Sequence, residues 1–208
     1  MRDPVKERAS WVGRHDFDSL PIDADVEVRC ARYAELPGLA DMAHRLVPGV
    51  DMTADVLGNY FAFDPESILT FSRQGKLLGA IAFLYLNDRG HDALLLDEIR
   101  LTQPEIEFLA AGKEEVSAIY IWACAITGRG ISGYGKVAEH LRKPRYVNAD
   151  VFAQPSTKAG RDWLVATCFK PIQSFQPDLW CYERAWNRIA MSVAVSKLQI
   201  RSCADARR

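Results

Sequence analysis

The feature that most constrains the fold is a strongly apolar run that leads directly into a cluster of glycines. Residues 117–127 (SAIYIWACAIT) carry apolar side chains at almost every position. Unbroken apolar character on both faces is typical of a strand that is covered on each side, so we predict a central strand here. The stretch 128–135 (GRGISGYG) follows at once, and residues 134–142 then have apolar side chains at helical spacing.

A strand that passes through a glycine-rich turn into a helix can bind an anion at the turn. The first amide groups of a helix lack partners within it, and the helix dipole favours negative charge there. Glycines allow a ligand to approach the backbone closely, and successive amides suit two linked phosphates. We therefore predict that a diphosphate lies on the backbone of Gly130, Ile131, Ser132, Gly133, Tyr134 and Gly135.

One alternative for the glycines is a P-loop, and the sequence argues against it. Gly130 and Gly135 have the required spacing, and Lys136 follows them. However, Val137 occupies the position where that motif has a Ser or Thr hydroxyl for a metal ion.

Three other interpretations of the glycines stay open. A dinucleotide-binding fingerprint can be written through Gly128, Gly130 and Gly133, with Asp150 at about the expected distance of 20 residues. Against it, the preceding chain is predicted to be a meander and not the start of a Rossmann fold. The glycines could also form only a tight turn between strand and helix. The last interpretation is a loop for the pyrophosphate of coenzyme A.

The remaining pattern predicts a mixed α/β fold. Residues 26–31 alternate as a half-buried strand does, and residues 67–86 read as a β-hairpin around the turn 74–76. Strands are further predicted at 93–101, 149–153 and 172–182, and helices at 36–46, 53–63, 103–111, 157–169 and 185–198. The glycine loop therefore follows the central strand of a sheet with helices beside it.

Composition and charge exclude several classes of protein. The 208 residues suit a single domain, and 26 basic against 27 acidic residues predict no attraction to nucleic acid or to an anionic membrane. Five cysteines without a C-x-x-C pair indicate a reducing compartment, and four scattered histidines predict no metal site. With no apolar segment at residues 1–20 and no run of about 20 apolar residues, we predict a cytoplasmic protein.

With its surroundings, the glycine loop resembles that of the GNAT superfamily of N-acetyltransferases. The cofactor signature of that family is [Q/R]-x-x-G-x-[G/A], between its fourth strand and third helix. Residues 130–135 match its last four positions and have glycine at the first, while Arg129 lies one residue earlier. The predicted order of strands and helices over residues 25–185 is also similar to that of the family, which implies a GNAT-like mixed, mostly antiparallel central sheet flanked by helices.

The resemblance implies an acyltransferase that moves an acetyl group from acetyl-CoA to an amine by direct attack. The acceptor would be a small molecule or a protein amine, and a homodimer is left open. The acyltransferase domain would span residues 25–185, with an N-terminal arm at 1–24 and a C-terminal helix and tail at 186–208. Two alternatives stay open: an enzyme that uses longer acyl-CoAs or an acyl carrier, and a non-catalytic domain that binds acyl-CoA or a partner.

The resemblance also implies where the cofactor binds. A backbone amide of the central strand, near Ala125 or Ile126, would polarise the thioester carbonyl. Thr157 stands where the family often has an Asn that caps the last helix. The implied cofactor-binding residues are Cys124, Ala125, Ile126, Arg129, Gly130, Ile131, Ser132, Gly133, Tyr134, Gly135 and Thr157.

The catalytic acid and base are less directly implied. Leu164 replaces the tyrosine that the family often uses as general acid, which leaves Tyr134 or Tyr182 for that role. Glu98 is the first candidate for the general base and Asp97 the second. Both are predicted to lie in the middle of a strand at 93–101, where an apolar environment would raise the pKa of one carboxyl.

Overall fold

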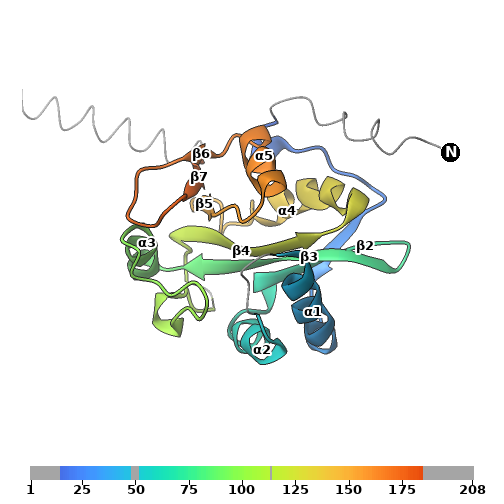
Figure 1. Ribbon diagram of the computed structural model, residues 1–208, viewed down its shortest axis with the longest axis horizontal. Coiled ribbons are helices and arrows are strands. Elements are labelled where there is room, and N and C mark those ends of the chain that lie inside the picture. The colour runs from blue at the N-terminus through green and yellow to red at the C-terminus, as the bar shows by residue number, and fades with distance from the viewer. Residues whose placement is uncertain (1–14, 48–51, 113, 185–208) are drawn as a thin grey trace, which may run out of the picture.

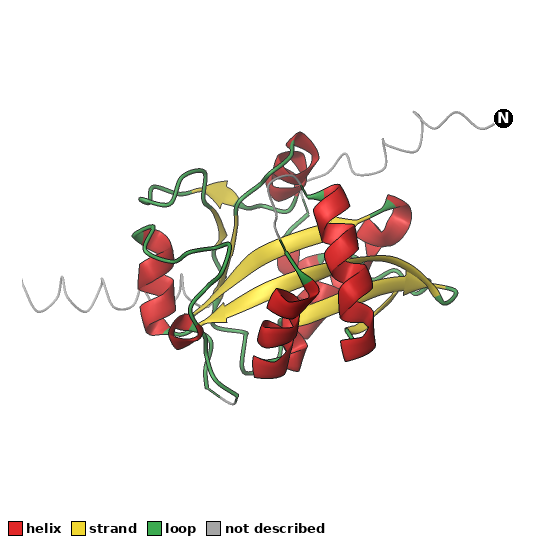
Figure 2. Ribbon diagram, turned by 60° about the horizontal axis from the view of Figure 1, so that its bottom comes forward, coloured by secondary structure: helices red, strands yellow, loops and turns green. Residues whose placement is uncertain are grey.

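A seven-stranded sheet with helices on both of its faces forms the fold (Figures 1 and 2). The computed structural model describes residues 15–47, 52–112 and 114–184. The strands are β1 (Glu27–Cys30), β2 (Ile68–Arg73), β3 (Lys76–Leu86), β4 (Ala118–Ile126), β5 (Asp150–Ala153), β6 (Lys170–Pro171) and β7 (Trp180–Tyr182). The α-helices are α1 (Leu36–Leu46), α2 (Ala54–Phe63), α3 (Asp88–Leu95), α4 (Tyr134–His140) and α5 (Lys158–Ala166).

The strand order in the sheet is β1-β2-β3-β4-β5-β7-β6. Strands β4 and β5 pair in parallel, and every other neighbouring pair is antiparallel. The chain crosses from β4 to β5 through α4, as a parallel connection requires. The predicted mixed α/β fold with a mostly antiparallel sheet is therefore confirmed.

The helices cover the two faces of the sheet in pairs. Figure 1 shows α1 and α2 below the sheet and α4 and α5 above it. Apolar side chains of α4 and α5 pack with β2, β3 and β4 in one core cluster, and those of α1 and α2 pack on the opposite face in another. Helix α3 contributes to a third cluster together with β3 and β4.

Local sequence explains several of these elements. Gln74 and Gly75 both have positive φ angles, of 50° and 74°, as a two-residue hairpin turn requires, so β2 and β3 pair as predicted. Thr53 caps α2 by accepting a hydrogen bond from the Val56 amide. Strand β4 coincides with the predicted central strand.

Two predicted elements are wrong, and a third is much shorter than expected. Residues 93–101 do not form a strand: the Asn87 side chain caps α3 at the Gly90 amide, and the helix continues to Leu95. The predicted helix at 103–111 is reduced to one 3-10 turn, Ile106–Phe108. Of the strand predicted at 172–182, only Trp180–Tyr182 pairs in the sheet. The helix predicted at 185–198 lies outside the described residues.

The described part of the predicted N-terminal arm packs against the domain. Phe17 is fully buried, and its ring lies 5.6 Å from that of Phe169 and 5.4 Å from that of Tyr182. The Tyr182 hydroxyl donates a hydrogen bond to Asp16 at 2.6 Å. Residues 15–25 thus run along α4 and α5, and Phe17 anchors them.

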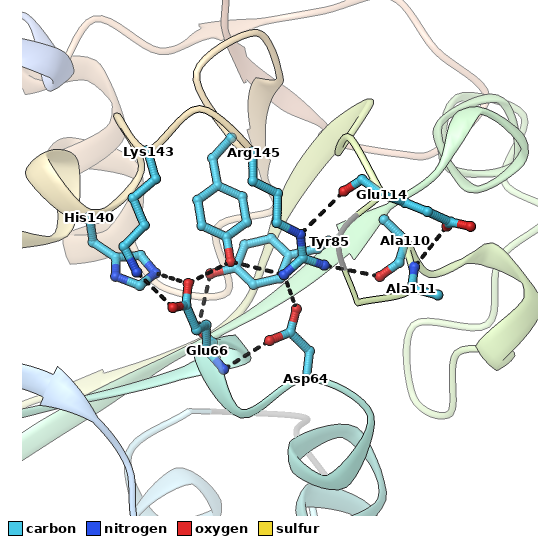
Figure 3. A network of polar contacts seen from close by, with 10 residues as sticks. Asp64, Glu66, Tyr85, Ala110, Ala111, Glu114, His140, Lys143 and Arg145 are labelled. Atoms are coloured by element: carbon cyan, nitrogen blue, oxygen red, sulfur yellow. Dashed lines mark hydrogen bonds and ion pairs between the residues drawn. The ribbon is translucent and has the colours of Figure 1, made fainter.

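A cluster of charged side chains joins α2 to the end of α4 (Figure 3). Arg145 donates to the Asp64 carboxylate at 2.6 Å and to the Ala110 carbonyl at 3.1 Å. Because the Asp64 side chain is only 9% exposed, this ion pair lies largely out of water.

Of the helices that the structure describes, none has the length and apolar character to span a bilayer.

Glu66 forms the second half of this cluster. Its carboxylate accepts hydrogen bonds from Lys143 at 2.7 Å and from the Tyr146 hydroxyl at 2.8 Å. The His140 ring stacks on Tyr146, and its Nε2 lies 3.6 Å from Glu66. Burial lowers the pKa of His140 to about 4, so this imidazole is neutral at pH 7.

We predict that His140 makes the fold sensitive to acid. Its pKa is about 4 in the folded protein and about 6.5 when unfolded. The unfolded chain therefore binds more protons between these values, and stability falls as the pH drops through this window. Replacing His140→Gln should reduce the loss of unfolding free energy between pH 7 and pH 4.5 by about 2 kcal/mol, measured by urea denaturation.

The matched control is His44→Gln, because His44 is an exposed histidine on α1. It should leave the pH dependence as it is in the parent chain. An identical loss of stability in the parent and in His140→Gln would contradict the prediction.

Candidate functional site

The site is a cavity of about 400 Å³ between β4 and β5. The two strands pair only from Ala118 to Ile121 of β4, opposite Asp150 to Ala153 of β5. Beyond this point they part, and the cavity lies in the gap. Its walls are the second half of β4, the segment after β4 with the start of α4, the segment from β5 into α5, and the end of α1.

A β-bulge in β4 lies at the point where the two strands part. Ala82 of β3 pairs with Ala123, whereas the next residue, Phe83, pairs with Ile121. Trp122 is therefore an extra residue on β4. A bulge of this kind bends and twists its strand. The bulge follows Ile121 directly, which is the last residue of β4 that pairs with β5, and β5 itself ends there at Ala153.

The bent half of β4 presents an unpaired backbone edge to the cavity. Residues 122–126 pair with β3 on one side. On the other side, within the described chain, β5 pairs no further than Ile121. Amide and carbonyl groups on this edge are available to a ligand that can form hydrogen bonds as a strand does.

The cavity reaches both layers of helices. Leu46 and Val47 line it from the end of α1, whereas Tyr134, Trp163 and Leu164 line it from α4 and α5. Figure 1 shows α1 on one face of the sheet and α4 and α5 on the other. Because residues of all three helices line the cavity beside β4, it is bordered from both faces of the sheet. Two molecules approaching from opposite faces could meet beside β4.

A thiol and a phenol meet in the wall of this cavity. The Cys124 Sγ and Tyr134 Oη atoms are 2.7 Å apart, and either can be the donor. The Tyr134 ring packs 4.3 Å from that of Trp163, which fixes its orientation. Burial raises the pKa of Cys124 to about 11 and holds that of Tyr134 well above its usual value. Both groups are uncharged at neutral pH, so this thiol is not poised as a nucleophile.

The glycines after β4 serve packing within the protein. A methyl group at Gly133 would lie 2.6 Å from Phe71 Cδ1, and one at Gly130 would lie 2.6 Å from Ile126 Cγ2. One at Gly135 would overlap the Pro21 carbonyl. Our interpretation that these positions lack side chains to admit a ligand is therefore wrong. They lack side chains because the sheet and the N-terminal segment approach so closely.

The segment at 128–133 is a 3-10 helix that continues into α4. Ile131 and Tyr134 face the cavity. Ser132 does not line it, and its hydroxyl donates to Asp23 at 2.6 Å, which ties the loop to the N-terminal segment. Arg129 is exposed beside these residues. Of the residues predicted to bind a diphosphate, Ile131 and Tyr134 line the cavity. The three glycines do not line it and pack against the protein.

The start of α5 forms the opposite wall. Thr157 caps this helix by accepting a hydrogen bond from the Gly160 amide at 3.0 Å. Gln154, Ser156 and Thr157 line the cavity with polar side chains. The structure therefore brings Thr157 together with Cys124, Ala125 and Ile126, as the predicted set of cofactor-binding residues requires.

The two predicted general bases lie elsewhere. Asp97 and Glu98 are exposed in the loop after α3, and neither lines the cavity. Asp97 has a φ of 59°, a left-handed conformation that ends the helix and does not occur in a strand. The apolar environment expected for these carboxyls is absent, which removes the physical reason for choosing them. Tyr182 does not line the cavity either, because its hydroxyl is bonded to Asp16.

Other cavity residues were missed by sequence reasoning. Trp122 was taken as one residue of a regular strand, because its position in a bulge depends on the register with β3. Trp163 lies in the helix predicted at 157–169, and the sequence alone does not place it at the cavity. Leu46 was expected only on an apolar helix face, and nothing in the local pattern sets it beside β4.

Comparisons with known proteins add a structural likeness. No protein-family model matches the chain, and no curated protein matches it. The structure is similar to solved structures of N-acetyltransferases. N-acetylglutamate synthase from Neisseria gonorrhoeae, complexed with coenzyme A and L-arginine, is 14% identical with a TM-score of 0.46. The match covers 78% of this chain and 34% of the synthase, so the chain spans about a third of that protein.

Two further matches span most of both chains. A GNAT family acetyltransferase from Brucella melitensis, in complex with acetyl-CoA, is 16% identical with a TM-score of 0.43, over 76% of this chain and 87% of that one. An N-acetyltransferase from Staphylococcus aureus Mu50 is 17% identical with a TM-score of 0.43, over 75% and 100%. Sequence identities and TM-scores this low carry no argument about function, so a function has to be argued from the cavity.

We predict that Gly133→Ala destabilises the fold. The added methyl group would press on Phe71 and Val26 in the core, and overpacking of this kind costs about 1–3 kcal/mol. Gly38→Ala on α1 is the matched control, because a methyl group there has nothing within 4 Å and helices favour alanine. Urea denaturation should show a loss for the first variant and none for the second. Equal stability of both would contradict the packing role.

Proposed function

We propose that this chain is an acyl-CoA-dependent N-acyltransferase of the GNAT superfamily, which transfers an acetyl group from acetyl-CoA to an amine. The observation that supports this most is the parting of β4 and β5 around a cavity that is bordered from both faces of the sheet. The cavity offers an unpaired strand edge to one elongated ligand, acetyl-CoA, and it is open to a second ligand, the amine, from the opposite face of the sheet. Direct transfer between two bound molecules requires both.

The residues around the cavity fit a pantetheine arm. That arm contains two amide groups, and the unpaired edge of β4 at Cys124, Ala125 and Ile126 offers it hydrogen bonds. The start of α5 at Thr157 faces the same space. The diphosphate would lie at the backbone of residues 129–135, on the side that carries Ile131 and Tyr134. When bound, acetyl-CoA supplies an acyl group that the thioester has already activated.

The chain would contribute positioning and two kinds of polar contact to the reaction. The Ile126 amide lies on the edge of β4 turned away from β3, because Thr127 and, by the alternation of an antiparallel ladder, Ala125 donate to β3. It stabilises the negative charge that develops on the carbonyl oxygen. Tyr134 donates its proton to the departing sulfur, since its hydroxyl lies in the cavity wall and remains protonated at neutral pH. Among the described residues that line the cavity none is charged, so the amine attacks in its neutral form. The proton that its nitrogen loses as the amide forms passes to water, and Tyr134 regains from water the proton that it gave to the sulfur.

A second candidate function is a non-catalytic domain that binds acyl-CoA. The absence of a carboxylate from the described residues of the cavity wall favours it, because an amine acceptor usually needs a base. Both candidates require binding of acyl-CoA, and only the enzyme releases coenzyme A when an amine is present.

We predict that acetyl-CoA and coenzyme A stabilise the protein against heat. A ligand that binds only the native state adds about 2.7 kcal/mol at 100 times its Kd. The melting temperature should therefore rise with the concentration of either compound, measured by thermal denaturation. Coenzyme A release with a panel of amines then distinguishes the enzyme from the binder. An unchanged melting temperature at millimolar acetyl-CoA, coenzyme A and longer acyl-CoAs would exclude both.

We predict that Tyr134→Phe lowers kcat on the order of 10²-fold while the KM for acetyl-CoA changes little, because only the proton donor is lost. In the parent chain, activity should not decline between neutral pH and about pH 10, since burial holds the pKa of Tyr134 well above its usual value. Tyr182→Phe is the control, as its hydroxyl contacts Asp16 away from the cavity. Equal kcat values in the two variants would rule out Tyr134 as the acid.

A further inference from the structure

The two sides of the cavity differ in chemistry. Its polar side chains, apart from Cys124, come from the segments around α4 and α5, namely Tyr134, Gln154, Ser156 and Thr157. The side nearest α1 is formed by Leu46, Val47, Trp122 and Ala123. In the described part of the chain, this second side presents only apolar side-chain surface.

Trp122 is held so that it offers a ligand only its ring. The indole Nε1 donates to the Leu101 carbonyl, so its one polar group is already occupied. The ring also packs edge-on against Tyr60, with 4.7 Å between centroids. Because the bulge in β4 places Trp122 at the point where the strands part, this fixed aromatic surface lies beside the unpaired edge.

Leu46 adds an apolar surface that faces water. It is 42% exposed at the last position of α1 and lines the cavity. A ligand that covers it gains from removing apolar surface from water. A ligand with several positive charges gains nothing comparable, because no described carboxylate lines the cavity, and each desolvated charge needs a partner.

We infer that the acceptor is an amine attached to an apolar body, aromatic or alkyl, which packs on Trp122 and Leu46, and not a polyamine. This inference rests on the proposed function and specifies its acceptor. The apolar body supplies the binding and carries a single amino group to the thioester. Entry into a cavity whose described lining carries no charge also favours the neutral form of that amine, which is the form that attacks.

The first test is a comparison of acceptors at saturating acetyl-CoA, with coenzyme A release as the readout. Phenethylamine and hexylamine represent the inferred class, and putrescine and spermidine the polycations. We expect kcat/KM to be at least about tenfold higher for phenethylamine and hexylamine than for the polycations. Burial of a few methylene groups is enough to give a difference of this size. Equal or higher values for the polycations would overturn the inference.

The second test changes the apolar surface itself. Leu46→Glu places a carboxylate at the cavity and should lower kcat/KM for phenethylamine about tenfold, while the value for putrescine rises. The control is Leu77→Glu, because Leu77 is 36% exposed in the hairpin and does not line the cavity. It should leave both values unchanged. An unaltered preference in Leu46→Glu would mean that the acceptor does not contact this surface.

A third variant, Trp122→Phe, keeps a ring and should raise the KM for phenethylamine without a similar change for acetyl-CoA. The inference and the function on which it rests fail in different ways. If acetyl-CoA neither raises the melting temperature nor yields coenzyme A with any amine, both are wrong. If coenzyme A is released but polycations are preferred, only the inference is wrong.

Discussion

The structure depends on how far β4 and β5 stay together. Four residue pairs hold the two strands in parallel, and the extra residue Trp122 follows directly after the last of them. If β5 paired with β4 beyond Ile121, the backbone groups of residues 122–126 would form hydrogen bonds within the sheet, and no cavity would lie between the strands. Because the strands part, the same groups line a cavity, and α1 on one face and α5 on the other border a common space.

Packing behind the cavity keeps this opening in place. The 3-10 segment and α4 lie close enough to the sheet and to the N-terminal segment that glycines are required at 130, 133 and 135. The bond between Ser132 and Asp23 ties this segment to residues that precede β1. On the cavity side, the contact of Trp163 with Tyr134 and the hydrogen bond between Tyr134 and Cys124 orient the Tyr134 hydroxyl. The segment is thus packed against the protein on one side and lines the cavity on the other.

Charged side chains gather away from the described wall of the cavity. The densest described network, around Asp64, Glu66 and Arg145, joins α2 to the end of α4 and does not line the cavity. Its carboxylates pair with Arg145 and Lys143. The cavity wall, in contrast, relies on backbone groups, hydroxyls and apolar surface. Such a lining offers a ligand shape and hydrogen bonds, which is the basis for the acceptor class inferred above.

The sequence by itself determined the elements whose signals are local. The apolar run at 117–127, the turn at Gln74-Gly75 and the cap at Thr157 each act within a few residues, so the central strand, the hairpin and the start of α5 could be predicted. Tertiary structure decided the rest. Residues 93–101 resemble a strand, but the Asn87 cap and the approach of Gly90 to the Phe108 carbonyl make the first of them helical. The bulge at Trp122 exists only in the register with β3, and the need for glycine at 133 comes from Val26 and Phe71, far away in the chain. Such contacts are set by the folded chain as a whole, and no local pattern encodes them.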